Sequence, residues 1–387
     1  MPFTRGKKPA LPAGSKIPKL NATTSENQDE GPQVKRSSSP PHGAPKKRTA
    51  FIDITNAHKV QISLPGRKKE AGKKQVKKTS APSVSAKNNA NLTKFVVSSS
   101  LLTFSSFLQI PEEFDIDSEN SEDCYMCPEY AKEIFDYLKQ REEKFVLCNY
   151  MPQQPSLNPE MRAILIDWLV EVQENFELYH ETLYLAVKMA DHYLSKTPVH
   201  RELLQLVGST AMLIASKFEE RSPPCVDDFL YICDDAYKRE EIISMEASIL
   251  QALSFDINIP IPYRFLRRYA KCVNAGMDTL TLARYYCEMS LMEMELVSER
   301  GSLLASACLL MALVTKDLGG WRPILQFHSG YQTSDLAPVV RKLYEMLLAP
   351  PDDKLRAVRS KYSHKVFFEV ASLPLVNVDI LDNALSQ

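Results

Sequence analysis

Two charged side chains interrupt an apolar helical segment of this sequence, and each of them needs a partner. In the stretch 158–176, apolar residues recur at helical spacing and occupy nearly the whole circumference of the expected helix. Arg162 and Asp167 lie within or beside that run. A charge removed from water must be paired or hydrogen-bonded, so each of the two predicts a partner elsewhere in the chain. The expected chemistry is ion pairing inside a helical bundle.

Patterns typical of catalysis or metal binding are scarce. The sequence has no Gly-rich phosphate loop, no HExxH and no GxSxG motif, and only 12 of its 387 residues are glycine. Cys124 and Cys127 form one CxxC without a second ligand pair at metal spacing, which favours a chance pair over a metal or redox site. We therefore expect no enzyme, no cofactor and no metal. A Ser/His/Asp site assembled from distant residues stays open as an alternative.

The charge is divided unevenly along the chain. Residues 1–100 hold 20 Lys+Arg and 5 Asp+Glu, a net charge of +15, whereas the remainder holds 27 and 43, a net charge of −16. The first 100 residues also hold 10 of the 25 prolines, so we expect a disordered basic arm. All eight cysteines follow that part, and without a signal peptide they indicate a reduced, nuclear or cytoplasmic protein. No apolar run reaches 18 residues, which predicts no membrane span.

Three basic clusters lie in the arm, at 46–48, 67–69 and 73–78. They favour nuclear import, and hence a nuclear protein, with a merely solvated tail as the alternative. Direct binding of nucleic acid is not expected, because the clusters have few interleaved aromatic residues and no fold to hold them. Ser39-Pro40 is a candidate proline-directed phosphorylation site.

Beyond the arm, helical patterns predominate and strand signals are nearly absent. The first group of predicted helices covers 130–145, 158–176, 181–194, 201–220, 226–233 and 239–253. After a break at Pro260-Ile261-Pro262, the second group covers 264–274, 279–298, 302–317, 335–348 and 354–371. Two successive groups of about five helices predict a tandem all-α architecture.

Four segments in the first group resemble the motifs of a cyclin box, in that family's order and spacing. They are MRAILIDWL at 161–169, LQLVG at 204–208, ASKFEE at 215–220 and LSFD at 253–256. A second, looser box resembles residues 260–375. The resemblance divides the chain into an arm at 1–124, a first cyclin box at 125–258, and a second box with a tail at 259–387. The chain most resembles B-type mitotic cyclins, and the segment QENFEL at 173–178 points to the B-three subclass.

The resemblance implies a regulatory subunit that binds and activates a cyclin-dependent kinase as a heterodimer, in mitotic and perhaps also meiotic division. Carried over from the family, Lys217 and Glu246 hydrogen-bond the kinase, and five apolar residues pack on its regulatory helix. Those five are Ile214, Phe218, Leu250, Phe255 and Ile257. The family also implies that Arg162 pairs with Asp191 to hold the first box together.

A second surface implied by the resemblance is a docking patch for Arg-x-Leu substrates. Glu171 would receive the substrate arginine. The remaining patch residues are Met161, Ile164, Leu165, Trp168, Leu204 and Gln205. Periodicity alone would bury every apolar residue of this set, so the patch is an expectation from the resemblance.

In the arm, residues 48–56 resemble the destruction box read by the anaphase-promoting ubiquitin ligase. The motif residues are Arg48, Phe51, Ile54 and Asn56, with Phe51 where leucine is usual. Ubiquitin-mediated destruction is therefore expected.

The competing interpretation of the double box is a transcription-initiation factor. Such a factor would need a basic body for DNA and commonly a zinc ribbon, whereas the body here is acidic and has a single CxxC.

Overall fold

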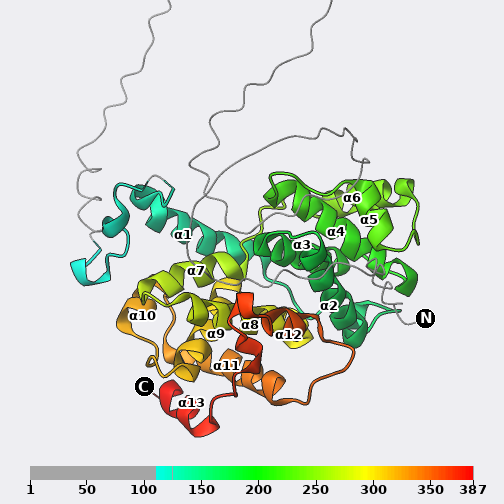
Figure 1. The fold of residues 1–387 in the computed structure, drawn as a ribbon. Helices are drawn as coiled ribbons and strands as arrows, with labels where there is room; N and C mark the ends of the chain where they lie inside the picture. Colours follow the sequence, from blue (N-terminus) through cyan, green and yellow to red (C-terminus); the bar gives the residue numbers. More distant parts are fainter. Residues whose placement is uncertain (1–109, 124, 387) are drawn as a thin grey trace, which may run out of the picture. The chain divides into compact units, whose positions relative to one another are not determined.

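Helices provide the regular structure of residues 110–123 and 125–386, which are the part of the chain described by this computed structural model. No strand occurs in that part. The arm's basic clusters, Ser39-Pro40 and the destruction box at 48–56 lie outside the described residues. The prediction of tandem all-α domains is confirmed (Figure 1).

The helices follow one another in two groups. The first group is α1 (Pro128–Glu142), α2 (Pro159–Asn175), α3 (His180–Leu194), α4 (Leu204–Glu219), α5 (Val226–Ile232) and α6 (Arg239–Ala252). The second is α7 (Pro262–Cys272), α8 (Met277–Ser290), α9 (Gly301–Thr315), α10 (Pro323–Ser329), α11 (Thr333–Leu348), α12 (Ala357–Tyr362) and α13 (Val378–Leu385). Short 3₁₀ segments extend or connect them, among them η5 (Glu143–Phe145), η7 (Arg201–Leu203), η8 (Met294–Leu296), η9 (Lys365–Phe367) and η10 (Val370–Ser372).

The second group departs from the sequence prediction at four places. The helix expected over 279–298 ends at Ser290 in α8, and the short η8 follows the extended Glu293. The single helix expected over 354–371 is wrong, because His364 adopts extended backbone angles, and Phe368 and Glu369 adopt left-handed ones. The structure has instead the short α12 followed by η9 and η10. Helices α10 and α13 were not predicted, although Pro323 at the first position of α10 and Gly330 after its end are ordinary helix limits.

Local side-chain chemistry fixes the start of α2. The side chain of Asn158 accepts a hydrogen bond from the backbone N–H of Met161 at 2.8 Å, and Pro159 occupies the first turn, where no N–H is needed. Most of α2 is buried. Helices α4 and α9 are also buried, each along nearly its whole length.

Helices α2 and α4 approach closely at Gly208. A Cβ at this position would lie 2.6 Å from Cδ1 of Leu165 on α2, closer than real Cβ contacts allow. Glycine therefore lets the two helices meet where two of the cyclin-like sequence motifs cross.

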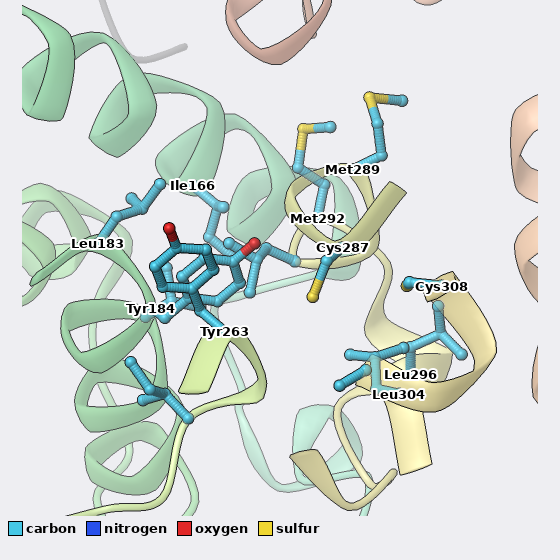
Figure 2. Packing of buried hydrophobic residues seen from close by; sticks show 14 of the residues in the cluster. Ile166, Leu183, Tyr184, Tyr263, Cys287, Met289, Met292, Leu296, Leu304 and Cys308 are labelled. Atoms are coloured by element: carbon cyan, nitrogen blue, oxygen red, sulfur yellow. The ribbon is translucent and has the colours of Figure 1, made fainter. Parts of the chain in front are cut away.

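The two helical groups share one hydrophobic core. The rings of Tyr184 on α3 and Tyr263 on α7 are stacked, with centroids 6.0 Å apart and planes inclined by 2°. Figure 2 shows these rings beside Ile166 and Leu183, with Cys287 and Cys308 of the second group farther along the same cluster. The groups are thus joined by packing as well as by the chain between α6 and α7.

Candidate functional site

Arg162 finds its partner inside the first group of helices. Its Nε and Nη2 donate to the two carboxylate oxygens of Asp191 on α3 at 2.7 and 2.8 Å, and Tyr150 OH donates to the same carboxylate at 2.6 Å. The remaining Nη1 donates to the carbonyl of Leu291, beyond α8, at 2.9 Å. Burial opposes ionisation of Asp191, yet the charge and hydrogen bonds of Arg162 hold the pKa of that carboxyl below its ordinary value. The pair predicted from the resemblance is formed, and its burial makes it structural.

Asp167 is tied to the second group. Its side chain accepts a hydrogen bond from the backbone N–H of Ala357, the first residue of α12, at 2.7 Å. Asp167 is buried at this junction. Both charges that interrupt the apolar run of α2 therefore have hydrogen-bond partners, and both link α2 to the second group.

A second buried charge cluster at the same junction was not predicted. Lys361 on α12 is 1% exposed, and its ammonium lies 2.6 Å from Glu288 on α8 and 2.8 Å from the amide oxygen of Gln173 on α2. Burial opposes ionisation of Glu288, but Lys361 nonetheless lowers the pKa of that carboxyl. The available signal was a charge inside the apolar run of α8, the same kind of signal as Arg162.

Lys217 and Glu246 meet on the surface between α4 and α6. The ammonium of Lys217 lies 2.6 Å from a carboxylate oxygen of Glu246, and Lys217 is exposed. Phe218, next to Lys217 in the sequence, is 45% exposed. Phe255, in the turn after α6, is 67% exposed. We call the set Lys217, Phe218, Glu246, Leu250 and Phe255 the α4–α6 surface. Leu250 is half-buried.

Of the predicted kinase-binding residues, Lys217, Phe218 and Phe255 are exposed, whereas Glu246 and Leu250 are half-buried. The prediction needs one correction. Ile214 is 3% exposed and belongs to the core, because it lies on the inner face of the almost fully buried α4. It can support the surface only from beneath. Ile257 is half-buried and packs against the core.

An exposed apolar row also lies on α1. Tyr130, Ile134 and Tyr137, spaced four and three residues apart, are all exposed. Arg141, one turn further, binds the carboxylate of Asp256 and donates to a backbone carbonyl in the turn after α6. The sequence analysis did not single out this row, because exposed and buried helical stripes have the same spacing. Ile243 on α6, also exposed, was missed for the same reason.

In the structure, some residues of the predicted docking patch are half-buried and others are fully buried. Met161, Ile164, Trp168 and Glu171 follow one face of α2 and are half-buried, and Gln205 on α4 is half-buried as well; we call the four on α2 the α2 stripe. Leu165 and Leu204, 1% and 0% exposed, are core residues. Their assignment to the patch surface is corrected, because Leu165 points to α4 over Gly208.

Among the described residues, no cluster of three or more His, Cys, Asp or Glu side chains has the arrangement of a metal site. Within the same part of the chain, every helix is too short or too polar to cross a bilayer.

Comparison with known proteins follows the same division into two helical groups. The sequence model described as "Cyclin, N-terminal domain" matches residues 133–258, and that described as "Cyclin, C-terminal domain" matches residues 260–375. A curated relative from Gallus gallus, named G2/mitotic-specific cyclin-B3, is 53% identical over 402 residues, covering 100% of both chains. The chain belongs to the cyclin family. The domain boundaries at 125–258 and 259–387 stay a prediction.

Other relatives carry the same name. In Homo sapiens, a G2/mitotic-specific cyclin-B3 is 54% identical over 278 residues, which are 72% of this cyclin and 20% of that protein. In Drosophila melanogaster, the identity is 46% over 292 residues, covering 72% of this chain and 51% of the other. A solved viral cyclin from herpesvirus saimiri, 24% identical, has the same fold with a TM-score of 0.50 over 55% of this chain and 96% of its own.

These relatives decide among the predicted classes. The likeness to B-type cyclins and their B-three subclass is confirmed. Cyclins are regulatory subunits, so this chain is not an enzyme. The mitotic names of its relatives favour the cyclin interpretation over a transcription-initiation factor.

Proposed function

We propose that this cyclin binds a cyclin-dependent kinase through the α4–α6 surface and switches the kinase on. The observation that supports this most is the paired Lys217 and Glu246 beside Phe218 and Phe255, since exposed apolar side chains rimmed by polar residues are typical of an interaction site. An interface needs apolar anchors surrounded by polar groups that fix the orientation, and this surface offers both.

The row on α1 enlarges the proposed interface. Arg141, one turn beyond Tyr137, fixes the end of α1 to the turn that carries Phe255. Tyrosine is favoured at interfaces, because it supplies a large apolar contact together with a hydroxyl. The kinase is therefore expected to contact α1 as well as α4 and α6.

The proposed mechanism is allosteric. A rigid helical surface would hold the regulatory helix of the kinase in its active position, keep the Lys–Glu pair of the kinase formed and order its activation loop. Rigidity comes in part from buried pairs in the first group of helices, such as Arg162–Asp191, which holds α2 to α3. This chain would perform no chemical step.

Co-purification tests the proposal. The full chain, expressed with an affinity tag in dividing cells, should retain a protein kinase identified by mass spectrometry, and the eluate should phosphorylate histone. Recovery of promoter DNA and basal transcription proteins, without kinase activity, would favour the rival class instead.

We further propose that the α2 stripe docks Arg-x-Leu substrates. Its half-buried Met161, Ile164 and Trp168 can receive an apolar side chain, and the carboxylate of Glu171, one turn beyond Trp168, can receive an arginine. Trp168→Ala should leave phosphorylation of a short peptide by the assembled kinase unchanged, whereas phosphorylation of substrates carrying the motif should fall several-fold. Equal loss with both substrates would contradict docking at this stripe.

The arm is proposed to control where and how long the protein persists, in mitosis and also in meiosis. Arg48 and Phe51 would anchor the anaphase-promoting ubiquitin ligase, and the three basic clusters would direct nuclear import. Arg48→Ala with Phe51→Ala should lengthen the half-life at mitotic exit. Neutralising the clusters should move the protein to the cytoplasm. An unchanged half-life of the Arg48 and Phe51 variant would contradict the destruction box. Persistent nuclear accumulation of the cluster variant would contradict the role of the clusters in import.

A further inference from the structure

The loop 220–225 between α4 and α5 presents a Ser-Pro pair to solvent. Arg221, Ser222 and Pro223 are exposed and lie outside regular secondary structure. A residue modified by another enzyme has to enter that enzyme's active site, and an exposed irregular loop allows this without unfolding a helix.

The other Ser/Thr-Pro pair within the described residues provides a contrast. Thr197 is half-buried, its N–H donates to the carbonyl of Tyr193 at 3.0 Å, and its carbonyl accepts from the side-chain amide of Gln154 at 2.8 Å. To reach an active site, the backbone at Thr197 would have to give up these bonds. Ser222 has no such restraint among the bonds of this loop.

The position of Ser222 connects it with the α4–α6 surface. Helix α4 ends at Glu219, so Ser222 follows Phe218 by four residues and Lys217 by five. A protein that covers Phe218 would also cover or approach this loop. The unbound chain would offer Ser222 freely, and the assembled complex would shield it.

The charges near the loop are unfavourable for an added anion. Glu219 directly precedes it and Glu220 is its first residue, and the carboxyl end of α4 contributes further negative potential. The guanidinium of Arg264 is already bound to both carboxylate oxygens of Glu219, at 2.8 and 3.1 Å. Exposed Arg221 remains as the adjacent cation.

We propose that Ser222 is a phosphorylation site for a proline-directed serine/threonine kinase, and that its phosphorylation on the free cyclin blocks assembly with the activating kinase partner. In this step the Ser222 hydroxyl oxygen bonds to the γ-phosphorus of ATP as the bond to the β,γ-bridging oxygen breaks. ADP leaves, and the hydroxyl proton passes to the catalytic base of the modifying kinase. The second half of the inference rests on the proposed function.

The effect follows from the charge that is added. A phosphoserine carries about −1.5 to −2 charges at neutral pH and disrupts where it lies at a helix carboxyl end, beside acidic residues or in an apolar interface. Ser222 follows all three features closely in the sequence. They are the end of α4 at Glu219, the acidic pair Glu219 and Glu220, and the exposed Phe218. Bringing a protein surface onto Phe218 would then require desolvation of a poorly paired dianion.

Phosphorylation itself is tested on the purified full chain with a proline-directed kinase and ATP, read by mass spectrometry. Phosphate should appear at Ser222 and be absent from the Ser222→Ala chain, and Thr197 should stay unmodified. Incubation of the preassembled complex should give at least fivefold slower modification of Ser222. A Ser222 that stays unmodified in the free chain would overturn the assignment.

The consequence is tested by binding of the partner kinase to the unmodified chain, the Ser222-phosphorylated chain, and the variants Ser222→Glu and Ser222→Gln. Phosphorylation should weaken binding at least tenfold and Ser222→Glu should weaken it in the same direction, while Ser222→Gln, a neutral side chain of similar size to glutamate, should bind as the unmodified chain does. Equal affinity of the phosphorylated and unmodified chains would refute the block. If the unmodified chain also fails to bind, the proposed function has failed instead.

Discussion

Individual buried residues account for much of how this cyclin holds its two boxes together. Arg162 pairs with Asp191 and also donates a hydrogen bond to the carbonyl of Leu291. Asp167 accepts a hydrogen bond from the backbone at the start of α12. A charge inside an apolar helical run signalled that a partner was required. The identity of the partner of Asp167 could not be predicted, because it is a backbone N–H, which every residue except proline carries.

At this scale, His192 predicts a pH dependence of stability. Burial, together with the nearby charge of Lys188, lowers the pKa of His192 from 6.5 to about 4. As pH falls below 6.5, the unfolded chain takes up a proton that the folded chain does not, so the free energy of unfolding falls between about pH 6.5 and pH 4. The contribution of His192 is about 1–3 kcal/mol by the lower limit of this window.

Denaturant unfolding at pH 7 and pH 5 measures this contribution. His192→Asn should lose less stability between the two pH values than the parent does, whereas His200→Asn, at an exposed position, should behave as the parent. An identical pH dependence for His192→Asn and the parent would show that this imidazole titrates normally in the fold.

Among the elements, the crossing of α2 and α4 sets the shape of the region around the α2 stripe. Gly208→Ala places a Cβ against Leu165, and overpacking of this kind typically costs about 1–3 kcal/mol of stability. Leu165→Ala alone should also destabilise, by about 2–5 kcal/mol, because it leaves a cavity. The double variant should lose clearly less than the sum, as each change relieves the other. Strict additivity in denaturant unfolding would mean that the helices do not meet there.

The elements were predicted well where local chemistry defines them. Asn158 and Pro159 mark the start of α2, and Pro262 marks that of α7. The breaks within 354–371 were missed, since no glycine, proline or asparagine in that stretch marks the extended angles of His364 or the left-handed angles of Phe368 and Glu369. The outward direction of Tyr130 and the inward direction of Ile214 could not be distinguished either, because periodicity groups residues on a face without saying what covers it.

For the molecule as a whole, Lys361 and Glu288 connect the two boxes through Gln173. Lys361→Met should destabilise the chain by about 3–5 kcal/mol, because it leaves the carboxylate of Glu288 buried without its cation. Adding Glu288→Gln should recover part of that loss, as the uncompensated charge is then removed. Calorimetric unfolding of both variants, with exposed Lys365→Met as the control, measures this. A loss below about 1 kcal/mol for Lys361→Met would contradict the role of this pair.

The central claim is that the α4–α6 surface binds the activating kinase. The most direct test uses the double variant Lys217→Ala with Glu246→Ala. Its affinity for the kinase and its thermal unfolding are both measured. Lys217 is exposed and Glu246 is half-buried at the surface, so removal of the pair should change stability by only about 0–1 kcal/mol. In the complex it would be desolvated, where loss of a partner costs about 2–5 kcal/mol, so affinity should fall at least a hundredfold and activation should disappear. Arg162→Ala is the control that should lose stability, by about 3–5 kcal/mol, through stranding Asp191. A double variant that melts like the parent and still binds and activates the kinase would contradict the assignment of this surface.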